Sequence, residues 1–173
     1  ALEAREALQA LSGGGPASLR EKSTALAGLL LEASGLAARG GGKDLATKTI
    51  ESGRALQKMK EIIEAQGGKP SLKAEDIPIG DQVATMTSPA DGYIVEIDNS
   101  AINAIAKAAG APMDKGAGIL LHAKVGYNIN KGSVMLEVFA EHSSKLTDAI
   151  SLSQKLKPIT VEGMLLRRMP EVA

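Results

Sequence analysis

The chain has 173 residues, which is enough for one ordinary domain or two small ones. Lysine plus arginine equals aspartate plus glutamate at 20 each, so the formal net charge is zero and no general attraction to nucleic acid or to an anionic membrane is expected. The absence of cysteine excludes disulfides and thiolate chemistry, and two histidines disfavour a histidine-rich metal site within one chain.

The start of the chain carries no signal peptide, and no apolar run in the sequence reaches the roughly 18 residues of a membrane span. These features predict a soluble, cytoplasmic protein. The chain begins at Ala1, without methionine and within amphipathic sequence, so we also expect it to be the C-terminal part of something longer.

Residues 1 to about 66 show the periodicity of helices, and we expect three of them. Glycines end the first and the last, while a proline and an aspartate mark the starts of the second and third. The expected markers are Gly13 after the first helix, Pro16 and Ser34–Gly35 around the second, and Asp44 and Gly67 around the third.

The second of these helices contains a charge within its apolar stripe. Leu19, Leu26, Leu30 and Ala33 share one face at 3.6 residues per turn, and Lys22 falls between them. A lysine there either extends its stem over apolar surface with its head in water, or borders a cleft that holds an anion or a polar ligand.

Two glycines fall inside the expected helices, where glycine is destabilising. We expect a close approach of a neighbouring backbone at Gly28 and at Gly53. The sequence SGRALQK (52–58) would then lie in the middle of the third helix, where the N–H groups are already used, so Arg54 is interpreted as a solvated helix residue rather than an anion ligand.

From about residue 69 the periodicity changes to that of strands. Two helical segments, 99–110 and 143–156, interrupt five short strand-like runs with turn residues between them, which predicts an α+β fold with a strongly curved or barrel-like sheet. Asp114, Lys115 and His122 are close in sequence here, but nothing in their spacing implies a nucleophile and base that meet in space.

Several longer stretches resemble one enzyme family. The sequences KSTALAGLLLEASG (22–35), ESGRALQKMKEIIEAQGG (51–68), SPADGYIVEIDNSAINAIAKAAGAPMDKGAGILLHAKVG (88–126) and NKGSVMLEVFAE (130–141) together resemble the C-terminal portion of the pyrimidine-nucleoside and thymidine phosphorylase family. The lysine–serine pair of the second helix and the closing PITVEGMLLRR (158–168) are most similar to its AMP phosphorylase branch.

The resemblance implies a fold and two domains. Residues 1–66 would be a helical segment that completes the family's large α/β domain, and residues 67–173 would form its C-terminal α/β domain with a barrel-sandwich-like curved sheet. The parent would be a pentosyltransferase in which inorganic phosphate cleaves an N-glycosidic bond. Its substrate would be AMP, giving adenine and ribose 1,5-bisphosphate, or thymidine, giving thymine and 2-deoxyribose 1-phosphate.

The resemblance also implies two site residues, one of them an ion ligand, and no organic cofactor. Lys22 matches the lysine with which the AMP branch contacts its nucleotide, and Glu6 matches a glutamate that ligates a monovalent cation in the bacterial pyrimidine branch. The family's phosphate-binding signature would precede this chain, so we expect no catalytic residue within it and no phosphorolysis by it alone. Its partners would be a nucleoside or nucleoside monophosphate and phosphate, without nucleic acid or membrane, and the parent would be a homo-oligomer.

Two alternatives remain open from the sequence. The runs around 88–97 and 124–138 also resemble half of a lipoyl- or biotinyl-carrier barrel, in which Lys115 at a hairpin tip would be acylated. The chain could also serve only as a scaffold that folds and associates. The base preference is not readable, because the base-reading residues of the family would mostly precede this chain.

Overall fold

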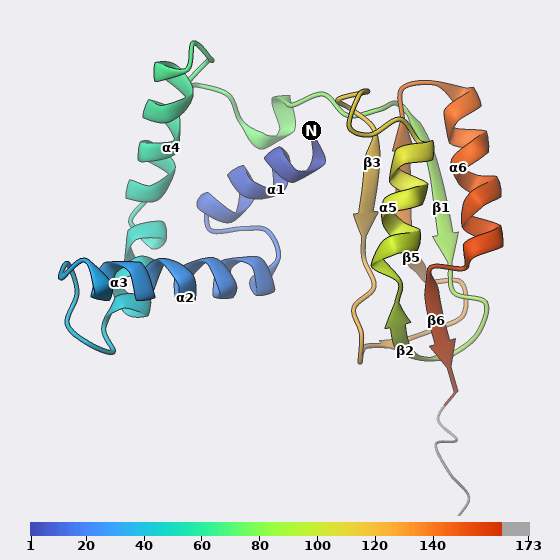
Figure 1. The fold of residues 1–173 in the computed structure, drawn as a ribbon, viewed down its shortest axis with the longest axis horizontal. Coiled ribbons are helices and arrows are strands. Elements are labelled where there is room, and N and C mark those ends of the chain that lie inside the picture. Colours follow the sequence, from blue (N-terminus) through green and yellow to red (C-terminus); the bar gives the residue numbers. More distant parts are fainter. Residues whose placement is uncertain (164–173) are drawn as a thin grey trace, which may run out of the picture. The chain divides into compact units, whose positions relative to one another are not determined.

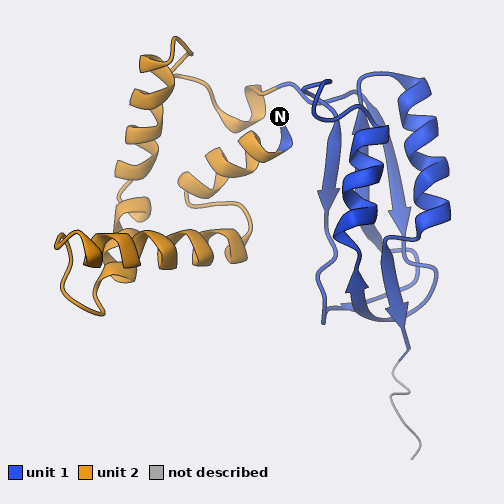
Figure 2. Ribbon diagram, in the orientation of Figure 1, with its two compact units in different colours: residues 1–2, 78–173 blue, residues 3–77 orange. Residues whose placement is uncertain are grey.

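The computed structural model describes residues 1–163, and its contacts form two compact units: residues 3–77, and residues 1–2 with 78–173 (Figures 1 and 2). Our boundary from the sequence was residue 67. The segment up to Ile77 groups with the helical unit, where Arg5 donates from Nε to the Ile77 carbonyl oxygen at 2.7 Å. The assignment of each part to a phosphorylase domain stays a prediction.

The helical unit contains four α-helices, not the three that we expected. They are α1 (Leu2–Leu11), α2 (Ala17–Ala33), α3 (Gly42–Glu51) and α4 (Arg54–Ala65), followed by the short 3-10 helix η1 (Ala74–Asp76) (Figure 1). The expected third helix is interrupted because Gly53 adopts a left-handed conformation, with φ of +75°, just before Arg54. The close backbone approach that we expected at Gly53 is wrong, since nothing lies within 4 Å of the place of its missing Cβ.

The backbone approach expected at Gly28 is confirmed. A Cβ at Gly28 would lie 2.4 Å from the backbone nitrogen of Lys43, and a Cβ at Gly42 would lie 2.0 Å from the carbonyl oxygen of Gly28. Helices α2 and α3 therefore pack backbone against backbone at this pair of glycines.

The second unit is α+β, with two small antiparallel sheets of three strands each. One sheet has the order β1-β5-β3 and the other the order β4-β2-β6. The elements are β1 (Gln82–Thr87), β2 (Gly92–Ile97), α5 (Asn99–Ala108), β3 (Gly118–Leu121), β4 (Asn128–Ile129), β5 (Val134–Ala140), α6 (Ser143–Leu156) and β6 (Ile159–Glu162).

Both sheets and both helices of this unit contribute to one apolar core. Helices α5 and α6 lie side by side and contact each other (Figure 1). The buried side chains include Ile94 of β2, Ile105 of α5, Leu136 of β5 and Ala149 of α6. The two sheets do not close into a barrel in the part of the chain that the structure describes, so the barrel-like sheet of our expectation is not found.

Local signals in this unit predicted the helices well and their caps less well. The sequence favours Asn99 or Ser100 as the N-cap of α5, but Asp98 has this role and accepts hydrogen bonds from the backbone nitrogens of Ser100 and Ala101 at 2.8 and 3.1 Å. The closing part of the last strand-like run, residues 164–168, lies outside the described residues. Among the described helices, none is long and apolar enough to cross a bilayer.

Candidate functional site

Helix α2 places Lys22 on an exposed face. The side chains that follow it on this face are Leu26, Leu29 and Leu30, which are 64%, 64% and 72% exposed. The opposite side of α2, with Thr24 and Gly28, is the one that is buried. The stripe that a helix normally buries is therefore uncovered in this chain, and Lys22 lies beside it in solvent.

A cavity of about 270 Å³ with charged residues in its walls lies on the side of α2 that carries Thr24. Its walls carry two cations, Arg20 and Lys43, and two carboxylates, Glu21 and Glu51. The Lys43 ammonium donates to Glu21 Oε1 at 2.8 Å, and this hydrogen bond and charge lower the pKa of Glu21 below its ordinary value.

Arg20 is held at the edge of this cavity by the loop that precedes α2. Its Nη1 donates to the carbonyl oxygen of Gly13 at 2.8 Å, while its Nε is buried without a hydrogen-bond partner among the described residues. Mixed charges on one wall suit a polar ligand better than an apolar one. Lys22 follows Arg20 by two residues and so points to a different side of α2 from this cavity, whose wall includes Thr24 of the buried face.

A second carboxylate of α2 organises the glycine-rich loop before α3. Glu32 Oε1 accepts a hydrogen bond from the backbone nitrogen of Gly42 at 2.9 Å. Backbone N–H groups of Gly40 and Gly42 lower the pKa of Glu32 below its ordinary value, since they stabilise the charged form. Glu32 was not singled out from the sequence, because the backbone group that it binds is ten residues away across a loop and no local pattern marks it.

Glu6 is half-buried on α1, in the same unit as Lys22. Among the described residues, no hydrogen bond or ion pair joins Glu6 to Lys22. The role of each stays a prediction.

The position that we gave to SGRALQK is wrong. Ser52 and Gly53 precede α4 instead of lying within a helix, and Arg54 is the first helical residue. Arg54 is nevertheless exposed, as expected, and donates from Nε to Ser52 Oγ at 3.2 Å.

The structure separates the residues of the sequence stretch 112–126. Asp114 accepts from the ammonium of Lys145 at 2.6 Å, whereas His122 contacts Glu137, with 2.8 Å between Nε2 and Oε2. Lys115 is exposed in the connection from α5 to β3, so it does not lie at the tip of a β-hairpin as a carrier lysine would. Together with the absence of a closed barrel in the described residues, this removes the structural basis of the carrier alternative.

Comparisons with known proteins give the relationships of the chain. The model of the pyrimidine nucleoside phosphorylase C-terminal domain matches residues 93–160, which run from β2 into β6. AMP phosphorylases of Thermococcus kodakarensis and Methanosarcina barkeri are 55% and 52% identical to it over 99% and 98% of this chain, and that of Pyrococcus horikoshii is 54% identical over 96%. The chain spans about a third of the length of these curated relatives, 33–34% in each case. It belongs to the AMP and pyrimidine nucleoside phosphorylase family and corresponds to the C-terminal portion of its members.

Proposed function

We propose that this chain forms part of a phosphorylase that converts AMP and inorganic phosphate into adenine and ribose 1,5-bisphosphate. In this reaction a phosphate oxygen forms a bond to the anomeric carbon, the bond from that carbon to the base nitrogen breaks, and the base leaves with a proton. The observation that carries the proposal is the 55% identity over nearly the whole chain to a relative named AMP phosphorylase. Thymidine, with thymine and 2-deoxyribose 1-phosphate as products, is the second candidate substrate, which the match to the pyrimidine nucleoside phosphorylase domain favours.

Within this activity, the chain contributes a contact to the nucleotide through Lys22. The side chain is exposed beside the uncovered leucines of α2, so it is accessible to an anionic ligand bound on this face of the helix. A lysine or arginine near a phosphate forms a charge-assisted hydrogen bond, which is about twice as strong as a neutral one.

The exposed leucines of α2 support a shared site, which means a nucleotide site formed jointly by this chain and by the remaining part of the parent protein. An apolar face with three leucines at least 64% exposed is unusual for an isolated helical unit. We propose that helices α1 to α4 complete a larger domain whose remaining part covers this face and carries the groups that bind phosphate. Glu6 would ligate a monovalent cation in that domain, and the parent would be a homo-oligomer.

The test compares two proteins: the 173-residue chain and the protein translated from the complete reading frame that contains it. Each is incubated with phosphate and AMP, CMP, UMP or thymidine, and the free base is measured by liquid chromatography. We expect phosphate-dependent release of base only from the second protein, with AMP as the best substrate. Turnover by residues 1–173 alone would contradict the shared site, whereas a preference for thymidine would contradict the AMP assignment alone.

A further inference from the structure

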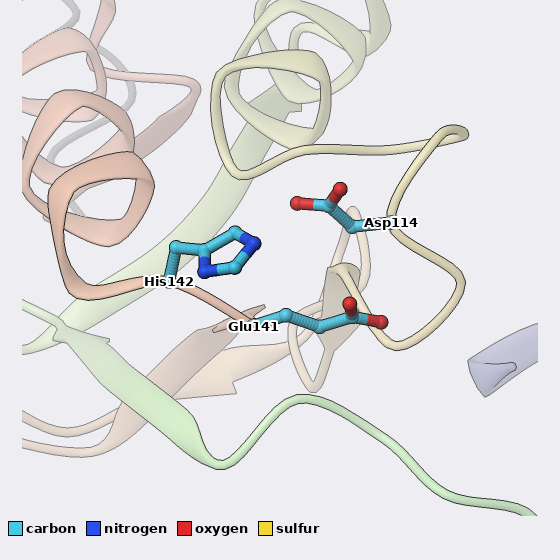
Figure 3. A group of neighbouring side chains, drawn as sticks. All are labelled: Asp114, Glu141 and His142. Carbon is cyan, nitrogen blue, oxygen red and sulfur yellow. The ribbon is translucent and has the colours of Figure 1, made fainter.

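The second unit contains a cluster of metal-ligating side chains that lies outside the proposed nucleotide site. Asp114 comes from the connection between α5 and β3, and Glu141 and His142 come from the junction between β5 and α6 (Figure 3). One ligand atom from each of the three side chains lies within 4.8 Å of the other two. His142 is one of only two histidines in the sequence.

Both carboxylates of this cluster are oriented by hydrogen bonds. Glu141 Oε1 accepts from the backbone nitrogen of Gly116 at 2.6 Å, and Asp114 Oδ2 accepts from the ammonium of Lys145 at 2.6 Å. The side chain of Asp114 is only 14% exposed, so its direction is fixed by packing as well. Carboxylates that bind metals are commonly held by such hydrogen bonds, which leave the second oxygen to the ion.

Glycines provide the space that these carboxylates occupy. A Cβ at Gly110 would lie 2.2 Å from Asp114 Oδ2, and a Cβ at Gly116 would lie 3.0 Å from Glu141 Oε1 and 2.6 Å from the backbone nitrogen of Gly80. The chain therefore packs two acidic groups beside an imidazole through contacts that a larger residue at either glycine would disturb.

We propose that Asp114, Glu141 and His142 bind a divalent transition-metal ion, with Zn²⁺ as the ion to test and water completing its coordination. One imidazole nitrogen and two carboxylate oxygens are a ligand set that zinc accepts. Tetrahedral zinc bonds would place these ligand atoms about 3.3 Å apart, so the cluster must contract by at most roughly 1.5 Å. Glu141 and His142 are exposed, which allows their side chains to rotate by that amount.

Lys145 would compete with the ion for Asp114. Its ammonium is the counter-charge of that carboxylate in the metal-free protein, and it follows His142 by three residues at the start of α6. Binding of a dication would weaken this ion pair. The N-terminus of α6 also adds a positive potential, which opposes any cation and limits the affinity. A bound ion would connect the α5–β3 connection to the start of α6 and would stabilise the fold of this unit.

The test uses the 173-residue chain without an affinity tag and Zn²⁺ alone. Two-dimensional NMR of the two imidazole rings shows which histidine responds, and isothermal titration calorimetry gives the affinity. We expect one equivalent of Zn²⁺ to shift the ring signals of His142 and not those of His122. His142→Ala and Asp114→Asn should each weaken binding by at least about tenfold, whereas Lys145→Met should strengthen it.

His122→Ala is the matched control, because it removes the other histidine, which contacts Glu137 away from the cluster. We expect it to leave Zn²⁺ affinity unchanged. Equal responses of both rings, or an affinity that neither His142→Ala nor Lys145→Met changes, would overturn the proposal. His142→Ala should weaken Zn²⁺ binding and Lys145→Met should strengthen it. Because loss of folding could only weaken binding, a gain in Lys145→Met cannot come from misfolding.

Discussion

At the scale of single residues, the proposed contact to the nucleotide depends on Lys22. The apolar stripe around it raised the question of why a helix would place an ammonium group there, and the structure answers that this stripe is exposed. The sequence predicted the position of Lys22 on the helix correctly, but apolar periodicity alone favours burial of the face of α2 that the structure leaves exposed. That choice depends on the backbone contact at Gly28, which is non-local.

We predict that Lys22→Ala, made in the protein from the complete reading frame, raises the KM for AMP by roughly tenfold to a hundredfold. This is the loss of one charge-assisted hydrogen bond of about 1.5–3 kcal/mol. The measurement is a steady-state assay of adenine release at varied AMP. Lys69→Ala is the control, since Lys69 is an exposed lysine of the same unit beyond α4. An unchanged KM for AMP in Lys22→Ala would contradict the proposed contact between Lys22 and the nucleotide.

The lowered pKa of Glu32 predicts that the stability of the folded chain depends on pH. Its pKa is below the ordinary value of 4.5 because the backbone N–H groups of Gly40 and Gly42 stabilise its carboxylate. The folded state therefore gains stability from Glu32 above pH 4.5, and this gain is lost as the pH falls through the folded-state pKa.

We predict that Glu32→Gln lowers the melting temperature at pH 7 and that the difference from the unmodified chain shrinks as the pH falls below 4.5. Thermal unfolding of both proteins between pH 3 and pH 7 measures this. Glu64→Gln is the matched control, because Glu64 is an exposed glutamate of the same unit. A difference in melting temperature that stays constant across this range would show that Glu32 acts through packing and not through its charge.

At the scale of elements, the contact between α2 and α3 depends on two glycines without room for a Cβ. We predict that Gly28→Ala destabilises the chain by about 1–3 kcal/mol, because the added methyl group would lie 2.4 Å from the backbone of Lys43. Urea unfolding followed by circular dichroism measures the change. Gly163→Ala is the matched control, since nothing lies within 4 Å of its added Cβ. Equal effects of the two substitutions would contradict the close packing.

The exposed apolar stripe of α2 predicts that the same substitutions affect the stability of the 173-residue chain and of the longer protein differently. Leu26→Gln with Leu30→Gln should leave the melting temperature of the 173-residue chain unchanged, because both side chains are already in solvent. In the protein from the complete reading frame, the same two substitutions should lower the melting temperature, since burial of each leucine contributes about 1.5–3 kcal/mol to stability. Leu8→Gln, at a residue only 7% exposed, should lower it in both proteins. A neutral result in the longer protein would mean that this face stays uncovered.

The elements themselves were predicted with uneven success, for physical reasons. Local signals were sufficient for α5 and α6, whose apolar periodicity lies within the helix sequence. The break before Arg54 was missed because a glycine inside a helical pattern can mark either a close approach or a left-handed turn. Gly28 and Gly53 show one case of each.

At the scale of the whole molecule, the order of the strands was beyond the reach of local patterns. Strand β1 pairs with β5 and β2 pairs with β6, so each pairing joins segments that are far apart in sequence. The cluster of Asp114, Glu141 and His142 was missed for the same reason, since the first comes from a different connection than the other two. The resemblance of several long sequence stretches, in contrast, was sufficient to identify the family, and the comparisons confirm this identification.

The measurement that tests the central claim most directly is phosphorus NMR of the protein from the complete reading frame, incubated with AMP and inorganic phosphate. We predict that the phosphate and AMP signals decrease together while two equal signals of ribose 1,5-bisphosphate appear. Omission of phosphate should abolish the change. Persistence of AMP, or its loss at the same rate without phosphate, would contradict the account.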